Sequence, residues 1–325
     1  MKDFNTEDHS STRPLISFII TTYNLPTSLL SECINSILAL SLNEHEREII
    51  LVDDGSAVSP LEGLKDLQNN ILFIRQTNKG LSAARNTGLK LSTGSYIQFV
   101  DGDDSLIRIH YEHCLDIIRY KEADLVLFDL TSQQEGNLPD TFNEPCSGTS
   151  YMQNNNIRAS ACGYIFRRAI LGKLRFREDI LMHEDEDFTP QLMLRAETVY
   201  KTDARAYYYR KRSGSITTKS TPEHVQKRLT NMENVIYHLR SLLDTIPQSC
   251  KPALNRRIAQ LTMDYLYNII VLTRKKNTLD NAIQRLEEHG LYPLPDKKYT
   301  KKYVYFRKMI NNRVLRNLLI LTLPK

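Results

Sequence analysis

Short apolar runs alternate with helix-length segments over the first 130 residues. The predicted strands cover 15–21, 48–52, 71–75, 95–100 and 124–128, where apolar residues are nearly continuous. Segments with helical spacing of apolar residues lie between them, at 29–40, 60–67, 80–91 and 106–120. Short strands separated by helices indicate βαβ units, so we expect an α/β fold: a Rossmann-like, mostly parallel sheet flanked by helices.

The rhythm changes after residue 130. Residues 133–150 are rich in Gly, Pro, Asn and Ser and predict a loop, while helical patterns at 167–173 and 188–196 precede a tyrosine-rich strand at 199–209. The patterns at 222–243 and 252–276 predict longer helices. We therefore expect four parts: a polar N-terminal tail at 1–13, a nucleotide half at 14–130, an acceptor half at 131–219 and a mainly helical region at 220–325.

The composition is that of an ordinary globular protein, with 41% hydrophobic and 25% charged residues among 325. These fractions exclude a wholly disordered chain and a collagen-like fibre. Five Cys without a CxxC pair argue against a disulfide framework and against a Cys-type zinc site. The start of the chain has no apolar signal region, and no apolar run approaches the roughly 20 residues of a spanning helix. We expect a cytoplasmic chain.

The positive charge is concentrated at the C-terminus. Residues 296–325 hold nine cations and one acid, so the rest of the chain is negative within a total of +5. Aromatic residues and a leucine-rich stretch accompany these cations, a combination that suits a helix lying on anionic lipid at the inner face of a membrane. A solvated helix whose leucines pack on the body explains the pattern equally well, whereas nucleic acid is disfavoured as a partner.

Polar side chains follow three of the predicted strands. Thr21, Thr22 and Tyr23 follow the first, and the Asp53-Asp54 pair follows the second. The fourth strand runs into Asp101-Gly102-Asp103-Asp104. Ligands of open α/β sheets bind beyond the carboxyl ends of the strands, so these side chains mark the expected site.

The sharpest of these motifs is Asp101-x-Asp103. Two carboxylates on a turn that leaves a strand can address one Mg²⁺ or Mn²⁺ ion, which would keep other positions for substrate phosphates. Because Asp and Gly are also common turn formers, the motif alone is compatible with a plain turn. Its position beside a second acidic pair favours binding of a metal and a nucleotide.

Two further segments carry candidate chemistry. Arg85 lies one turn inside the helix that begins after Gly80, where it suits a phosphate or an acidic neighbour. The run from His183 to Phe188 places four acids before a helix; these either complement the helix dipole or supply a general base, with Glu184 and Asp185 as candidates. A basic loop after the last tyrosines, around Arg210 and Ser215, could close over a diphosphate.

The order of these motifs resembles glycosyltransferase family 2. The matching segments are TTYN, VDDGS, the helix with Ser-Ala-Ala-Arg-Asn, FVDGDD and Glu-Asp-x-x-Phe, and they span about residues 14–216. The resemblance implies a GT-A fold and an enzyme that transfers a sugar from a nucleotide-sugar donor with inversion. It also implies a saccharide or lipid-linked saccharide acceptor, with UDP as the expected nucleotide and surface polysaccharide as the expected product.

The resemblance also implies roles for individual residues. Thr21 and Tyr23 would line the base and ribose pocket, and Asp54 would bind the base with support from Asp53. Arg85 would position the nucleotide. Asp101 and Asp103 would hold the diphosphate and Mn²⁺ or Mg²⁺, with Asp104 adjacent. Asp185, beside Glu184, would deprotonate the acceptor hydroxyl as the nucleoside diphosphate leaves.

Three alternatives stay open on the sequence. Asp101-x-Asp103-x-Ser105 also resembles the nucleophile motif of haloacid-dehalogenase-like phosphatases, which would make Asp101 a covalent nucleophile. A non-catalytic nucleotide-sugar-binding subunit would lack the acidic motifs that are present here. A nucleic-acid-binding protein would rest on the basic tail alone.

Overall fold

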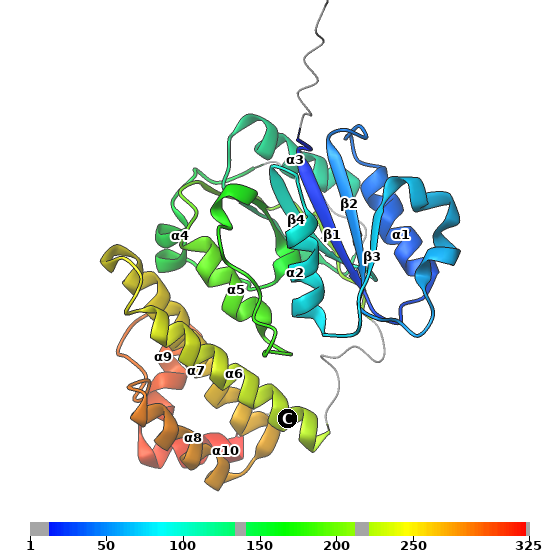
Figure 1. Ribbon diagram of the computed structural model, residues 1–325. Helices are drawn as coiled ribbons and strands as arrows, with labels where there is room; N and C mark the ends of the chain where they lie inside the picture. Colours follow the sequence, from blue (N-terminus) through cyan, green and yellow to red (C-terminus); the bar gives the residue numbers. More distant parts are fainter. Residues whose placement is uncertain (1–12, 134–140, 212–220, 323–325) are drawn as a thin grey trace, which may run out of the picture.

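The computed structural model describes residues 13–133, 141–211 and 221–322. Its main element is a seven-stranded sheet in the order β3-β2-β1-β4-β8-β6-β9 (Figure 1). The strands are β1 Ile16–Thr22, β2 Arg47–Asp53, β3 Leu72–Arg75, β4 Tyr96–Asp101, β6 Leu125–Leu127, β8 Tyr164–Arg167 and β9 Val199–Lys201. All adjacent pairs are parallel except the two that β8 makes with β4 and β6, which confirms the expected mostly parallel α/β sheet.

Helices cover both faces of this sheet. Those of the α/β part are α1 Thr27–Leu38, α2 Leu81–Leu91, α3 Arg108–Tyr120, α4 Gly148–Asn154 and α5 Glu184–Met193, with short 3₁₀ helices at Pro60–Asn70, Ala161–Gly163 and Arg168–Ile170. Phe18 and Phe99 lie on opposite faces because their strands place Phe18 beside Gln98. Tyr111 of α3 packs on Phe18, whereas Phe188 of α5 packs on Phe99.

Helix α2 lies close to the sheet because of one glycine. A Cβ atom on Gly88 would collide with Cγ2 of Ile19, a core residue of β1. The absence of a side chain therefore lets α2 settle against the centre of the sheet. This approach fixes Arg85, one turn earlier on the same helix, above the end of β4.

A small second sheet pairs three short strands in the order β5-β10-β7. They are β5 Ser105–Leu106, β7 Leu130–Thr131 and β10 Tyr207–Tyr208. Because β5 follows directly after the acidic turn at the end of β4, this sheet ties the turn to β10, which lies much later in the chain. The predicted single strand at 199–209 is thus two strands, β9 and β10, in different sheets.

The helical region forms a second hydrophobic cluster. Its helices are α6 Pro222–Leu242, α7 Lys251–Thr273, α8 Lys276–Glu288, α9 Lys301–Ile310 and α10 Arg313–Thr322, with a 3₁₀ turn at Gln248–Cys250. Their apolar residues form a core separate from that of the sheet. These helices lie together at the end of the molecule below α5 in Figure 1. The predicted boundary near residue 220 lies outside the described residues and stays a prediction, as does the polar tail at 1–13, of which only Arg13 is described.

Three local predictions were incomplete. Strand β8 was not predicted, and the helix expected at 167–173 is only a 3₁₀ turn after it. Helix α4 occupies the end of the expected loop at 133–150, where Ser147 caps it by accepting a hydrogen bond from the amide of Ser150. Helix α5 begins at Glu184 rather than at 188.

Candidate active site

Three strand ends meet at one edge of the main sheet. Thr22 at the end of β1 pairs in register with Asp53 at the end of β2, and Thr21 pairs with Asp101 at the end of β4. The segments that the sequence singled out after these strands therefore lie side by side. Tyr23 follows β1 with about half of its surface exposed, so its ring is open to a ligand.

The acidic turn after β4 is tightly built. A Cβ atom on Gly102 would lie 2.7 Å from Cδ2 of Leu30 and 3.0 Å from the carbonyl oxygen of Thr21, so a side chain there would push the turn away from the sheet. The Gly102 amide donates to the Thr21 carbonyl at 3.1 Å. Glycine thus allows the two carboxylates of Asp101 and Asp103 to stand directly at the strand end.

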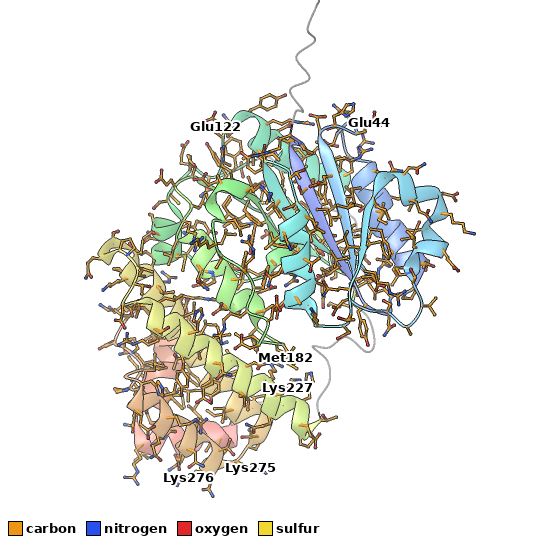
Figure 2. All side chains as sticks on the ribbon, viewed as in Figure 1. Glu44, Glu122, Met182, Lys227, Lys275 and Lys276 are labelled. Atoms are coloured by element: carbon orange, nitrogen blue, oxygen red, sulfur yellow. The ribbon has the colours of Figure 1, made fainter. Side chains whose placement is uncertain are left out.

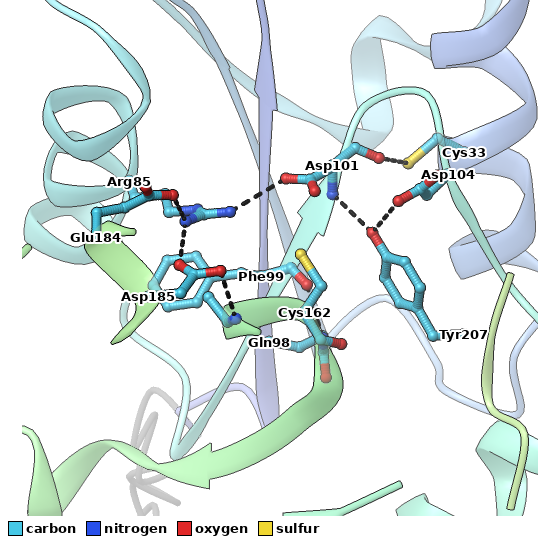
Figure 3. Close-up of polar contacts among 11 residues, drawn as sticks. Cys33, Arg85, Gln98, Phe99, Asp101, Asp104, Cys162, Glu184, Asp185 and Tyr207 are labelled. Atoms are coloured by element: carbon cyan, nitrogen blue, oxygen red, sulfur yellow. Dashed lines mark hydrogen bonds and ion pairs between the residues drawn. The ribbon is translucent and has the colours of Figure 1, made fainter. Parts of the chain in front are cut away.

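Asp104 secures this turn from below. Its Oδ2 accepts a hydrogen bond from the Tyr207 hydroxyl at 2.8 Å, and its Oδ1 accepts one from the Arg210 amide at 2.8 Å. The Tyr207 hydroxyl in turn accepts from the Asp101 amide at 3.0 Å (Figure 3). Burial, followed by the negative charge of Asp101, raises the pKa of Asp104 to about 7. Asp104 is thus placed to hold the turn on β10.

Arg210 also braces the turn. Its Nε donates to the Asp103 carbonyl oxygen at 3.0 Å, and its Nη2 reaches Glu32 of α1 at 2.5 Å. The sequence suggested that the loop around Arg210 could close over a diphosphate. In the structure the side chain of Arg210 lies beside the Asp103 backbone, where it stabilises the acidic turn. Ser215 lies outside the described residues.

Arg85 joins the acidic turn to the acidic helix start. Its Nη2 lies 3.3 Å from Oδ1 of Asp101, and its Nη1 donates to Glu184 at 3.0 Å and to Asp185 at 2.6 Å (Figure 3). The guanidinium is buried beside the rings of Phe99 and Phe176. One buried cation therefore pairs with carboxylates from two motifs that are far apart in the sequence.

Asp185 is held in one orientation. Besides the ion pair with Arg85, its Oδ2 accepts a hydrogen bond from the Ala161 amide at 3.0 Å. Its side chain keeps about a fifth of its surface exposed, whereas Glu184 is buried. Burial, and secondly the charge of Asp185, raises the pKa of Glu184. Asp185 is therefore the carboxylate of this pair that an outside hydroxyl can reach.

The other two acids of the run point to the helical region. Glu186 forms an ion pair with Arg257 of α7, and Oδ1 of Asp187 lies 2.5 Å from Nδ1 of His238 on α6. The four acids therefore have two roles. Glu184 and Asp185 form ion pairs with Arg85, whereas Glu186 and Asp187 attach the C-terminal helices.

Asp53 and Asp54 already hold loops of the protein itself. Oδ1 of Asp53 accepts hydrogen bonds from the Ser56 amide and hydroxyl, at 3.0 and 2.5 Å, and Oδ2 lies 3.3 Å from Nε of Arg75. Asp54 accepts from the amides of Lys79 and Gly80 at 2.9 and 2.8 Å. Both carboxylates therefore hold the loops that follow β2 and β3 in place.

The residues fit a divalent cation only with help from a ligand. No group of three or more His, Cys, Asp or Glu side chains within the described ranges is arranged to hold a metal ion. Asp101 keeps 37% of its side chain exposed, and its neighbour Asp103 adds a second carboxylate. Mg²⁺ and Mn²⁺ commonly take one or two carboxylates and complete their shell with substrate phosphates and water, which suits this donor set.

Several contributors had no clear signal in the sequence. The Ala161 amide has no side chain that could reveal it, and Arg257 and His238 come from helices without a recognisable motif. Tyr207 belongs to the tyrosine-rich segment predicted at 199–209; it is buried, and Tyr208 is half-buried. The hydrogen bonds of Tyr207 with Asp101 and Asp104 could not be predicted from the sequence, because they depend on the pairing of β10 with β5 in the second sheet.

Known proteins are similar to this chain in sequence and in fold. The family described as "Glycosyl transferase family 2" matches residues 17–174. The uncharacterized glycosyltransferase EpsJ of Bacillus subtilis is 33% identical over 235 residues, which cover 66% of this chain and 67% of EpsJ. The poly(ribitol-phosphate) beta-N-acetylglucosaminyltransferase TarS of Staphylococcus aureus is 26% identical over 225 residues, covering 67% of this chain but only 38% of TarS.

Solved structures support the fold. A crystal structure of S. aureus TarS 1–349 in complex with UDP-GlcNAc superposes with a TM-score of 0.61 at 21% identity, covering 85% of this chain and 89% of the other. The mannosyltransferase PcManGT of Pyrobaculum calidifontis, in complex with GDP-Man and Mn²⁺, gives a TM-score of 0.55 at 14% identity, with 96% and 85% covered. The fold is therefore the GT-A fold of glycosyltransferases. Across the described residues, none of the helices combines the length and apolar character needed to span a bilayer.

Proposed function

The chain belongs to glycosyltransferase family 2, and we propose that it is an inverting transferase that moves a sugar from a UDP-sugar to a hydroxyl of a saccharide or lipid-linked saccharide. One relative is the minor teichoic acid biosynthesis protein GgaB of Bacillus subtilis, which agrees with a role in building a surface polysaccharide. The observation that carries the proposal is the buried Arg85, which brings Asp101 of the acidic turn and Asp185 of α5 to the same guanidinium.

The reaction would be a single displacement. The acceptor oxygen attacks the anomeric carbon and gives its proton to Asp185, while the bond from that carbon to the diphosphate oxygen breaks and the nucleoside diphosphate leaves. Asp185 suits the base because it is fixed by Arg85 and the Ala161 amide yet partly exposed. Glu184 would act as a positioning residue, since its buried carboxylate holds Arg85.

The donor would lie along the strand ends. The exposed ring of Tyr23 offers a stacking surface for the base, and the loops that Asp53 and Asp54 hold would lie beside it, next to Thr21. Asp101 and Asp103 would hold Mn²⁺ or Mg²⁺, which when bound supplies positive charge for the departing diphosphate. Asp104, through Tyr207, would keep both carboxylates in place.

The C-terminal helices suit a membrane surface. Tyr303, Phe306 and Ile310 of α9 are buried in the helical core, as the packed-helix alternative expects. The outer side of α10 is different: Val314, Leu318 and Leu321 are exposed beside the cations of the tail. Exposed leucines next to cations favour binding to anionic lipid, so we propose peripheral docking of α10 on the inner face of the membrane, near a lipid-linked acceptor.

The phosphatase alternative is disfavoured. It would require Asp101 to act as a nucleophile, yet this carboxylate faces Arg85 within a family 2 transferase sequence. The acidic motifs whose loss would mark a non-catalytic subunit are present and joined.

Donor binding tests the proposal directly. Isothermal titration with UDP-, GDP- and dTDP-sugars in Mn²⁺ should give metal-dependent binding of a UDP-sugar, and slow hydrolysis of the same donor should be detectable. Asp103→Asn should abolish both. Asp129→Asn, which removes an exposed carboxylate paired with Lys201, should leave both unchanged. Tight binding of a donor that persists in Asp103→Asn, or turnover of a simple phosphomonoester alone, would contradict the proposal.

A further inference from the structure

The edge of the sheet opposite the candidate active site carries an open, strongly basic pocket. It has a volume of about 570 Å³, and its ten lining residues include five cations and no carboxylate. The cations are Arg13, Lys90, Arg167, Arg168 and Arg175. They come from the segment before β1, from the end of α2, and from the last residue of β8 and the segment after it, so the fold gathers them from distant parts of the chain.

Four of these cations lack a carboxylate partner within the described ranges. Arg167 pairs with Asp124 at 3.2 Å. Arg168 instead donates to the hydroxyl and carbonyl oxygens of Ser92, and Arg175 donates to backbone carbonyl oxygens in its own loop.

Besides Asp124, the partner of Arg167, the acid Glu48 lies near the pocket. The negative charge of Glu48 by itself raises the pKa of Arg168, but its carboxylate accepts hydrogen bonds from Thr93 and Ser17. It is therefore turned toward the loop between α2 and β4, and it leaves most of the positive charge uncompensated.

The arginines that line the pocket are close enough to act on one another electrostatically. Burial lowers the pKa of Arg168, and the positive charge of Arg13 lowers it further, with a smaller effect from Arg175. Like charges that approach without counter-ions repel, and an anion between them would turn this repulsion into attraction.

The pocket is separate from the donor site. Ser95 and Arg167 lie at the beginning of β4, because Tyr96 pairs with Arg167, whereas Asp101 is the last residue of that strand. Six residues of strand span about 16 Å. A ligand in this pocket is therefore distinct from the sugar donor at the opposite edge.

We propose that this pocket, at Arg13, Lys90, Arg168 and Arg175, is a binding site for an anion that carries two or more phosphate groups. Guanidinium groups match phosphate oxygens with paired hydrogen bonds, whereas lysine contributes a point charge. Four uncompensated charges correspond to the charge of a diphosphate or triphosphate rather than of one carboxylate. Such an anion is a soluble polyphosphate.

A membrane lipid is a poorer source of these phosphates. The pocket lies at the end of the molecule near Glu122, while Lys275 and Lys276 mark the opposite end, which the helical region forms (Figure 2). A bilayer that contacts α10 would therefore not reach Arg13 and Arg175 at the same time.

Calorimetric titration of the full chain with inorganic pyrophosphate and tripolyphosphate, in EDTA and about 0.1 M salt, tests the site. We expect one tripolyphosphate per chain. Arg13→Gln/Arg175→Gln should weaken this binding at least about tenfold, because two phosphate-facing cations are lost. Arg13→Gln/Lys90→Gln provides a second variant in which only exposed side chains change. Lys275→Gln/Lys276→Gln removes the same charge elsewhere and should bind as the wild type does.

Three results would overturn the proposal. The first is that the wild type does not bind tripolyphosphate, and the second is that the Lys275→Gln/Lys276→Gln control weakens binding as much as the pocket variants do. The third is that the pocket variants lose binding to phosphatidylglycerol vesicles but keep binding to tripolyphosphate, which would identify a lipid headgroup as the ligand instead. UDP-sugar affinity in Mn²⁺ should stay unchanged in all three variants, so the outcome is independent of the proposed transferase function.

Discussion

Nη1 of Arg85 lies 2.6 Å from Oδ1 of Asp185, while Nη2 of the same guanidinium faces Asp101. This contact joins the end of β4, which would hold the donor diphosphate, to the start of α5, which would hold the base. The two groups need to act on opposite sides of the transferred sugar, and a rigid buried cation between them fixes their separation.

Replacing Arg85 should damage both folding and catalysis. Arg85→Gln would leave Asp101, Glu184 and Asp185 without their shared cation, and breaking a buried ion pair costs about 3–5 kcal/mol. Denaturant unfolding should show that loss, and transfer activity should fall at least a hundredfold. Arg108→Gln, which removes an exposed pair with Glu112, should change stability by less than about 0.5 kcal/mol. Wild-type stability in Arg85→Gln would contradict the role.

Asp185→Asn should separate chemistry from binding. The amide keeps the size of the side chain but cannot take the acceptor proton, so kcat should fall by about 10²–10⁴-fold while donor affinity stays near that of the wild type. Steady-state kinetics and donor titration give the two quantities. Glu186→Gln is the matched control, because Glu186 pairs with Arg257 away from Asp185. A similar fall of kcat in the control would indicate a structural effect of the whole run.

The attachment of the helical region should depend on the Arg257–Glu186 pair. Arg257→Met would leave Glu186 without its counter-charge, and we expect a loss of about 3 kcal/mol in the free energy of unfolding. Adding Glu186→Gln should recover part of that loss, since the buried charge is then removed as well. A double-mutant cycle from denaturant unfolding measures the recovery. Strictly additive effects would show that the pair contributes no coupling.

His183 should make stability fall in mild acid. Burial, and secondly the charge of Arg228, lowers the pKa of this ring to about 4. The unfolded chain, with the usual value near 6.5, therefore binds more protons between pH 6.5 and pH 4. Stability should be full above pH 6.5 and should fall by up to about 3 kcal/mol as pH drops to 4.

Asn is the suitable replacement for this histidine, since His183 has a left-handed backbone with φ of 66° that Asn tolerates. Unfolding measured from pH 4 to pH 7 should show a smaller slope in His183→Asn than in the wild type. Identical slopes would mean that another group causes the acid sensitivity.

Vesicle binding should depend on the outer side of α10. Deleting 297–325 would also remove Tyr303, Phe306 and Ile310 from the helical core, so substitutions are the cleaner test. Leu318→Asp/Leu321→Asp should weaken sedimentation with phosphatidylglycerol vesicles about tenfold or more. Val58→Asp, at an exposed apolar position in the α/β part, is the control. Unchanged sedimentation of the α10 variant would contradict membrane docking.

Much of the fold could be predicted because its central strands are long and apolar. Strands β1, β2 and β4 are almost entirely buried, so their sequence reads as continuous apolar runs that end in polar motifs. Strand β8 was missed because it is four residues long and is defined by antiparallel pairing with β4 and β6. That pairing is a property of the folded chain and leaves no local pattern.

The site was predictable to the same depth. Strand ends of a parallel sheet lie at one edge, which brought Thr21, Asp53 and Asp101 together on the sequence alone. The pairing of Arg85 with Asp185 could not be derived this way, because it depends on how α5 returns to the sheet. The sequence also could not show which acids of the run at 184–187 face Arg85 and which face the C-terminal helices, because that depends on the partners that the fold brings to each side chain.

The double use of that acidic run has a consequence for protein engineering. Because Glu186 and Asp187 reach α7 and α6, the C-terminal helices are not an exchangeable cassette that can be cut off after the last strand. A chimera that takes its helices from a relative would also have to inherit the matching residues at 186 and 187, while retaining Glu184 and Asp185. The first turn of α5 would then combine residues 184 and 185 of this chain with residues 186 and 187 of the relative.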